Sequence, residues 1–397
     1  MGLESIAVYP FERLQKLFAG VSHPDHIDCT IGEPQHAPPR FVLDAHNEAV
    51  AKYAGSYPKT RQIPQLTEAI AGYAQRNLGV SLSEKNILAL CGSGEGLFSM
   101  PLFAKNRSGK NTVVLQTPSY KPYEGAADLA GMRTEFEALT AEHIHQPLFK
   151  PFMRGDVQRD AALMFINYPN NPCGANASRE TLEKAISLAQ EHDFILASDE
   201  CYIDIFNTDV YGTGRPLSAL TVAKDMDVKD FRNVLVFNSL SKRSSLPGMR
   251  SGFMAGDPKL IEQYMRVRML ERKVMPTYIQ VASAAAWSDD QHARENRELY
   301  TRKINEFGDI VHRRQYTPSM GTFFIWFKAP QGFTGETFAK ELCVQTGVKT
   351  LPGAYLCTPK YANPEAEQHV RIALVHDVER QREAARRIQS FIGGVGQ

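Results

Sequence analysis

The feature that most restricts the fold is a series of short apolar runs between residues 40 and 285. A strand with one wet face alternates apolar and polar residues, whereas a strand covered on both faces is apolar throughout. Helical patterns separate the runs, and one of them spans 178–192, where Ser178 and Glu180 are typical of a helix start. The alternation predicts a parallel sheet between two layers of helices. The expected strands are 86–92, 112–116, 161–167, 194–198 and 233–238, and a further helix is expected over 95–105.

The pattern changes beyond about residue 285. Charged helical stretches alternate there with two apolar runs, which is typical of a smaller α+β unit. The expected elements are a helix over 288–314, strands over 322–329 and 369–376, and a helix over 379–392.

We therefore expect two domains, which suits a chain of 397 residues. The large domain would span residues 41–285, and the small domain would combine residues 1–40 with residues 286–397. Ligands of open parallel sheets bind beyond the carboxyl ends of the strands. The polar residues that follow the strands of the large domain are therefore the candidate site.

Composition excludes several classes of partner. The 45 basic and 44 acidic residues nearly cancel, so neither nucleic acid nor a membrane surface is an expected partner. The six cysteines are scattered without a CxxC pair, so neither a metal site nor a disulfide framework is expected. The first 20 residues lack the pattern of a secretion signal, and no run of 18 apolar residues occurs. We expect a cytoplasmic protein.

A glycine-rich turn, "CGSGEGLF" at residues 91–98, lies between an expected strand and helix. Backbone amides at the start of a helix bind phosphate well. A dinucleotide site would need an acidic residue after the next strand, but that position reads "LQTPSY", and no Walker lysine is present. The turn therefore favours a phosphate monoester.

Three further strands are each followed by a polar residue suited to chemistry. Asn171 follows the strand 161–167, Asp199 ends the next strand, and Lys242 follows the run that ends at residue 238. An amide, a carboxylate and a lysine beside a phosphate turn are what pyridoxal phosphate requires: an amine for a Schiff base and an acid for the ring nitrogen.

At this point the chain resembles the class I and II aminotransferases, which are pyridoxal-phosphate enzymes of fold type I, over nearly its whole length. The resemblance implies an α/β fold with a mostly parallel seven-stranded sheet between helices, plus a smaller α+β domain. One departure is Cys173, where the family usually has threonine. The motifs that carry it are, in order, "IGEP", "YP" at 57–58, "GSGEGLF", "NPCG", "SDECY", "SLSKRSSLPGMRSGF" and "RIAL".

The resemblance assigns roles around the cofactor ring. It implies that Lys242 binds the cofactor covalently and removes the substrate α-proton, and that Asp199 pairs with the ring nitrogen. Asn171 and Tyr202 would hydrogen-bond the ring oxygen, and Tyr120 would stack on the ring. The phosphate would be held by Ser93, Gly94, Ser239, Ser241 and Arg250.

The resemblance also implies a substrate site and a partner. Arg371, with Gly32 and Asn171, would bind the α-carboxylate of an amino acid or keto acid, because the arginine fork matches a carboxylate. Tyr57 would reach the phosphate of a neighbouring subunit, which implies a homodimer with shared active sites.

Within the family, "SKRSSLPGMRSGF" and "LPGAYL" resemble the succinyldiaminopimelate aminotransferases of bacterial lysine biosynthesis. That resemblance implies N-succinyl-LL-2,6-diaminopimelate as donor, with 2-oxoglutarate and glutamate as the other pair. An aromatic, glutamine or acetylornithine aminotransferase remains an alternative. So does a C–S β-lyase, which would release pyruvate and ammonia without a keto acid acceptor. Arg272 and Lys273 are candidates for binding a distal carboxylate, or are solvated helix charges.

Overall fold

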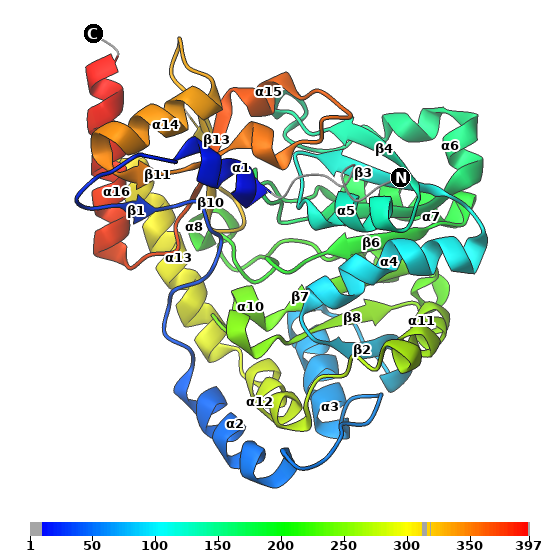
Figure 1. Cartoon of the computed structure of the whole chain (residues 1–397). Helices are drawn as coiled ribbons and strands as arrows, with labels where there is room; N and C mark the ends of the chain where they lie inside the picture. Colours follow the sequence, from blue (N-terminus) through cyan, green and yellow to red (C-terminus); the bar gives the residue numbers. More distant parts are fainter. Residues whose placement is uncertain (1–9, 312–315, 318, 396–397) are drawn as a thin grey trace.

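The computed structural model describes residues 10–311, 316–317 and 319–395. Its centre is a seven-stranded sheet in the order β2-β8-β7-β6-β5-β3-β4 (Figure 1). Strand β8 is antiparallel to both of its neighbours, and the other pairings are parallel. The expected mostly parallel seven-stranded sheet is confirmed. The strands are β2 (Ile87–Leu90), β3 (Thr112–Thr117), β4 (Arg133–Ala138), β5 (Ala161–Asn167), β6 (Ile195–Asp199), β7 (Val234–Ser239) and β8 (Gly252–Gly256).

All five expected strands of this sheet form, with ends within two residues of the expected ones. No apolar run indicated the other two strands. The strand β4 reads "RTEFEA", and β8 reads "GFMAG", which contains two of the residues least favoured in strands. Hydrogen bonding to a neighbouring strand, and not their own composition, therefore makes these two segments strands.

Helices cover both faces of this sheet, as the apolar runs predicted. In β5, Leu163 and Phe165 contact one helical layer, while Met164 and Ile166 contact the other. Burying each such side chain contributes about 1.5–3 kcal/mol, so the two layers fix which residue faces which side. The first layer contains α4 (Ser93–Ser108), α5 (Pro122–Leu129) and α11 (Pro258–Glu271). The second contains α3 (Pro64–Tyr73), α7 (Arg179–His192), α9 (Ala219–Asp225) and α12 (Thr277–Ser288).

A second, four-stranded sheet has the order β12-β13-β10-β9. Its apolar face packs against three helices through residues such as Ile325, Phe307, Phe338 and Ile388. The strands are β9 (Tyr316–Thr317), β10 (Phe324–Lys328), β12 (Leu351–Pro352) and β13 (His369–Ala373), and the helices are α13 (Gln291–Ile310), α14 (Gly335–Thr346) and α16 (Val378–Val395).

The segment before α2 (Arg40–Tyr53) lies beside this second sheet. The strand β1 (Ile27–Asp28) pairs in parallel with β11 (Val348–Lys349). The expected domain division at residues 40 and 285 stays a prediction. Residues 1–9 of the expected small domain and residues 312–314 of the expected helix 288–314 lie outside the described residues. The remaining α-helices of the described residues are α1 (Pro10–Leu17), α6 (Gly155–Asp160), α8 (Thr208–Tyr211), α10 (Leu240–Arg243) and α15 (Pro364–Glu367).

Among the residues described above, no helix is both long enough and apolar enough to cross a bilayer.

A buried carboxyl group, Glu200, joins the end of β6 to α9. Its Oε1 accepts hydrogen bonds from the backbone N–H of Ala219 (2.8 Å) and from the hydroxyl of Ser198 (3.0 Å). Burial raises the pKa of Glu200 to about 7, against these hydrogen bonds, which lower it. A carboxyl group whose pKa is higher in the folded than in the unfolded chain stabilises the fold while it is protonated.

We predict that this contribution is present below pH 4.5 and is lost as the pH rises to about 7. Relative to Glu200→Gln, the wild type should therefore lose stability over that range, by on the order of 2–3 kcal/mol. Urea unfolding at pH 5 and pH 8, followed by circular dichroism, measures the difference. The exposed-residue variant Glu191→Gln is the control and should show the wild-type pH dependence. Parallel curves for wild type and Glu200→Gln would contradict the prediction.

Candidate active site

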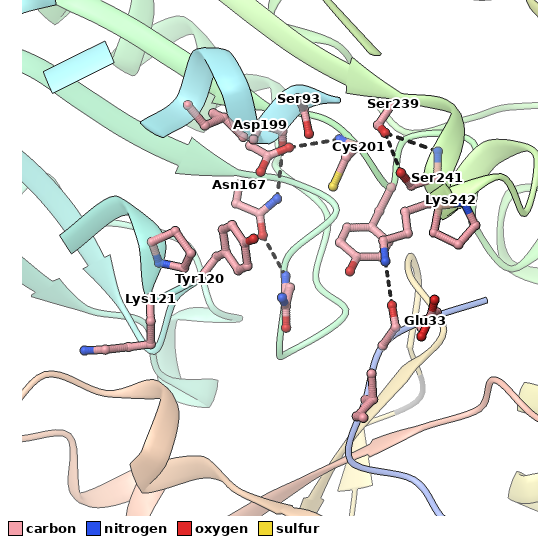
Figure 2. A pocket seen from close by; sticks show the side chains of 18 of the residues that line it. Glu33, Ser93, Tyr120, Lys121, Asn167, Asp199, Cys201, Ser239, Ser241 and Lys242 are labelled. Carbon is pink, nitrogen blue, oxygen red and sulfur yellow. Dashed lines mark hydrogen bonds between the residues drawn. The ribbon is translucent and has the colours of Figure 1, made fainter. Parts of the chain in front are cut away.

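A cavity of about 330 Å³ opens at the carboxyl ends of the central strands. Residues from the loops after β3, β5, β6 and β7 meet there with the start of α4 and with residues of the second sheet. Figure 2 shows Asp199, Ser239 and Lys242 around the same space. The structure brings together these residues expected from the sequence: Gly32, Ser93, Gly94, Tyr120, Asn171, Asp199, Tyr202, Ser239, Ser241, Lys242, Arg250 and Arg371.

Three candidates lie elsewhere. Tyr57 is fully exposed and does not line the cavity of its own chain. Its expected contact with a neighbouring subunit stays a prediction. Arg272 and Lys273 are also exposed and do not line the cavity. Within one chain they are solvated charges at the end of α11, which is the second of the two interpretations given above.

The start of α4 forms an anion cradle. Gly92 precedes the helix with φ +80, a conformation that favours glycine. A Cβ at Gly92 would lie 2.8 Å from Nη2 of Arg250, so the guanidinium lies directly against this turn. On the other side, Ser239 donates a 3.0 Å hydrogen bond to Ser241. Helix amides, hydroxyl groups and one guanidinium thus converge, which suits a phosphate.

The acid of the site is Asp199, the last residue of β6. The hydroxyl of Tyr123 donates to its Oδ2, and the backbone N–H of Cys201 donates to its Oδ1 (3.2 Å). Burial raises the pKa of Asp199, while the hydrogen bonds from Tyr123 and Cys201 lower it. A cationic ring nitrogen beside this carboxyl group would favour its ionised form.

Tyr123 was not among the residues expected from the sequence. It is buried on α5, where its ring stacks on Phe165 at 4.6 Å between centroids. The surrounding letters, "PSYKPYEG", carry no signal for this contact, because Tyr123 and Asp199 are 76 residues apart.

A second residue that the sequence did not indicate, Asn167, joins two neighbouring strand ends. Its Nδ2 donates to the carbonyl of Asp199 (2.8 Å), and its Oδ1 accepts from the backbone N–H of Asn171 (2.9 Å). The place of Asn167 at the end of an expected strand was a signal that could have found it. The pair of bonds fixes the loop that carries Asn171 relative to Asp199.

Lys242 lies in the one-turn helix α10, directly after β7. Its Nζ donates to the carbonyl oxygen of Gly32, the bond drawn from Lys242 in Figure 2. Burial lowers the pKa of Lys242 to about 8, and Arg371 lowers it further, against Cys201, Glu33 and Asp199, which raise it. Roughly a tenth of the amine would therefore be unprotonated at pH 7, far more than for an ordinary lysine, and the unprotonated form is the one that acts as a nucleophile or a general base.

Arg371 reaches the cavity from β13 of the second sheet. It donates from Nη1 to Oδ1 of Asn171 (2.8 Å) and from Nη2 to the carbonyl of Thr30 (2.6 Å). Its guanidinium lies 4.2 Å above the centre of the Phe324 ring. These contacts orient the planar fork, which binds a carboxylate better than a lysine would.

These groups fit pyridoxal phosphate. The cradle at α4 suits the phosphate, the buried carboxyl group of Asp199 suits a protonated ring nitrogen, and Lys242 lies in the same cavity as both. The guanidinium of Arg371 suits a carboxylate group on a substrate that binds in the same cavity.

Comparison with known proteins gives the same assignment. The family model described as "Aminotransferase class I and II" matches residues 24–388. An LL-diaminopimelate aminotransferase from Nitratidesulfovibrio vulgaris (strain Hildenborough) is 31% identical over 393 residues, covering 97% of each chain. An aminotransferase structure from Neisseria meningitidis is 33% identical, with a TM-score of 0.91 and 98% of each chain covered. A probable N-succinyldiaminopimelate aminotransferase from Thermus thermophilus is 27% identical, with a TM-score of 0.82, covering 96% of this chain and 99% of that one.

The cradle generates a prediction for Gly92→Ala. The added methyl group strains the backbone at φ +80 and displaces the Arg250 guanidinium, so affinity for inorganic phosphate should fall about tenfold or more, the loss of a charge-assisted hydrogen bond. Isothermal titration of cofactor-free protein with phosphate measures it. Gly109→Ala is the matched control, because Gly109 has a similar φ of +71 at the other end of α4 and an added Cβ there meets nothing within 4 Å. Equal phosphate affinity in the two variants would contradict the prediction.

Proposed function

The chain belongs to the class I and II aminotransferase family, and we propose that it transfers the amino group of N-succinyl-LL-2,6-diaminopimelate to 2-oxoglutarate. The family depends on pyridoxal phosphate and uses amino acid and keto acid substrates. The observation that carries the proposal is one cavity lined by an amine of lowered pKa, a buried carboxyl group and a carboxylate-binding guanidinium: Lys242, Asp199 and Arg371.

Each of these side chains has one role in the proposal. Pyridoxal phosphate supplies an aldehyde that binds amines and a ring that accepts an electron pair. Arg371 binds the α-carboxylate of the amino acid and of the keto acid, because both substrates share this group. With the cofactor bound, Asp199 would pair as a carboxylate with the protonated ring nitrogen, and the hydrogen bond from Tyr123 favours that ionised form of Asp199.

Lys242 transfers the proton. With a pKa of about 8, its amine can take the α-proton of the substrate near neutral pH and return it. The carbonyl of Gly32 can only accept a hydrogen bond, so it engages one N–H of Lys242. The lone pair of the neutral amine takes no part in that bond and remains available to accept a proton.

A succinylated substrate needs a second cation beyond Arg371, because a distal carboxylate left unpaired in a closed site is costly. Lys121 also lines the cavity, and it is buried in an ion pair with Glu124. Lys360 lies 3.5 Å from Glu124 and 2.6 Å from Asp128. Glu124 would therefore keep a cationic partner if Lys121 turned to a substrate carboxylate, and we propose Lys121 for that role.

A second candidate substrate is LL-diaminopimelate without the succinyl group, the compound in the name of the relatives from Nitratidesulfovibrio vulgaris. Its distal end carries an ammonium group as well as a carboxylate. Glu33 lines the cavity at an exposed position and supplies an acidic group suited to that ammonium. Both candidates carry a distal carboxylate that Lys121 would bind, so they differ in the distal ammonium group, and Glu33 is the side chain that would favour LL-diaminopimelate.

We further propose a cytoplasmic homodimer in which each subunit supplies Tyr57 to the phosphate site of the other. The support is that Tyr57 lies fully exposed and outside the cavity of its own chain. Its hydroxyl group is thus available to a second subunit.

The lysine assignment makes the first prediction of the proposed function. Borohydride reduction of the holoenzyme should attach the cofactor to Lys242, and peptide mass spectrometry should find it there. Lys242→Ala should lose turnover by several orders of magnitude while keeping its circular dichroism spectrum. Cofactor on any other lysine would overturn the assignment.

The substrate assignment is tested with a panel of amino donors, each supplied with 2-oxoglutarate. We expect the highest kcat/KM with N-succinyl-LL-2,6-diaminopimelate, and LL-diaminopimelate, glutamate, phenylalanine and kynurenine complete the panel. Arg371→Lys should lower kcat/KM for every donor, about tenfold or more, because all share the α-carboxylate. Lys121→Met should penalise the succinylated donor and glutamate and spare phenylalanine. A clear preference for LL-diaminopimelate would select the second candidate, and a preference for phenylalanine would overturn both.

A further inference from the structure

Lys242 lies on a helix of one turn, so its backbone has few partners within its own segment. The helix α10 ends at Arg243, and carbonyl groups at the end of a helix have no partner in the helix itself. The buried side chain of Asn296, on α13, supplies that partner. Its Nδ2 donates to the carbonyl oxygens of Lys242 (3.0 Å) and Arg243 (3.0 Å).

The other end of the same amide contacts a different part of the chain. Oδ1 of Asn296 accepts from Nδ1 of His36 (2.6 Å) and from the hydroxyl of Ser245 (3.2 Å). The orientation of the amide follows from its partners, because carbonyl groups can only accept and must therefore face the NH₂ group. His36 must then carry its proton on Nδ1.

Lys303 completes the chain of contacts. Its Nζ donates to Nε2 of His36 (2.6 Å) and to the carbonyl of Leu374 (3.3 Å), and the side chain is buried. Burial, with Lys303 adding to it, lowers the pKa of His36 to about 4, so the imidazole is neutral near pH 7. A neutral ring with Nδ1 protonated and Nε2 accepting satisfies both neighbours, and each polar atom of the amide has a partner.

His36 lies four residues after Gly32, whose carbonyl oxygen accepts from Nζ of Lys242. That segment has little freedom, because a Cβ at Gly32 would lie 2.6 Å from the Phe324 ring. Asn296 therefore holds the backbone of Lys242 on one side and, through His36, the acceptor of its amine on the other.

We propose that Asn296 is a positioning residue for the reaction: it fixes the turn that carries Lys242 against the segment that carries Gly32, and so sets where the amine lies. This inference rests on the proposed function, in which Lys242 is the reacting lysine. Without the amide, the carbonyls of Lys242 and Arg243 lose their donor and the turn can shift. A displacement of about 1 Å is enough to slow a reaction about 100-fold.

The first readout needs no cofactor and no activity. In cofactor-free protein, competitive acetylation of lysines across a pH series, read by peptide mass spectrometry, follows the titration of Lys242. Asn296→Ala should raise its midpoint from about 8 by about one unit, because a loosened turn lets water reach the amine. The other groups that act on this amine, Cys201, Arg371, Glu33 and Asp199, are unchanged in the variant.

Asn363→Ala is the matched control. Asn363 is also a buried amide, and it also donates to two backbone carbonyls, those of Thr117 (2.9 Å) and Leu139 (3.4 Å), but it does not contact the turn of Lys242. It should lose comparable stability and leave the Lys242 titration unchanged. In the holoenzyme, Asn296→Ala should lower kcat about tenfold or more and change KM by less than about threefold.

The outcomes separate this inference from the proposed function. Borohydride label on a lysine other than Lys242 would overturn the proposed function. Label on Lys242, with the same acetylation midpoint in wild type and Asn296→Ala, would overturn this inference alone. If Asn296→Ala does not fold, His36→Ala serves in its place, because it removes one donor to Oδ1 and leaves both carbonyl bonds. It should shift the midpoint in the same direction by a smaller amount, and no shift would overturn the inference.

Discussion

The register of adjacent parallel strands is the constraint on which the site depends. Asn167 at the end of β5 lies opposite Asp199 at the end of β6, which in turn lies opposite Phe237 of β7. The loops that carry Asn171 and Lys242 therefore start from one edge of the sheet. Both faces of these strands are buried against helices, so a slip by one residue would move every side chain to the other layer. The packing of the whole sheet thus holds the acid and the amine in one cavity.

Burial also sets the chemistry of the cavity. It raises the pKa of Asp199 and lowers the pKa of Lys242, so both shifts favour the uncharged form. Burying ionisable groups without charged partners costs free energy, and a ligand with complementary groups lowers that cost. A cofactor that brings a cation to the carboxyl group and an electrophile to the amine does so at both ends, which is why these two side chains suit pyridoxal phosphate together better than either does alone.

The second sheet contributes what the first lacks. Arg371 comes from β13, yet its fork is oriented by Asn171 after β5 and by the carbonyl of Thr30, in the segment that follows β1. Asn296 on α13 connects the turn that carries Lys242, after β7, to His36 in the segment that follows β1. The orientation of the Arg371 fork and the position of the Lys242 amine therefore both depend on how residues of the second sheet and α13 lie against the central sheet. In the proposed function, the central sheet would hold the cofactor, and Arg371 of the second sheet would supply the group that binds the carboxylate of an amino acid.

The sequence by itself determined the parallel sheet and the residues that line its edge. Unbroken apolar runs indicated strands buried on both sides, and the residues expected after them, Asp199 and Lys242 among them, do line the cavity. These features are local, because an apolar run or a glycine-rich turn favours its structure through residues that lie close together in the sequence. The two poorly patterned strands, β4 and β8, were not visible in this way, because their strand partners stabilise them and their own composition does not.

The tertiary structure alone decided which distant side chains support the site. Tyr123 meets Asp199 across 76 residues, and Asn296 meets the carbonyl of Lys242 across 54. It also decided that Tyr57, Arg272 and Lys273 lie outside the cavity of their own chain. A hydrogen bond between segments far apart depends on the packing angle and register of whole elements. No pattern in either segment records it, so only the folded chain determines which polar groups become partners.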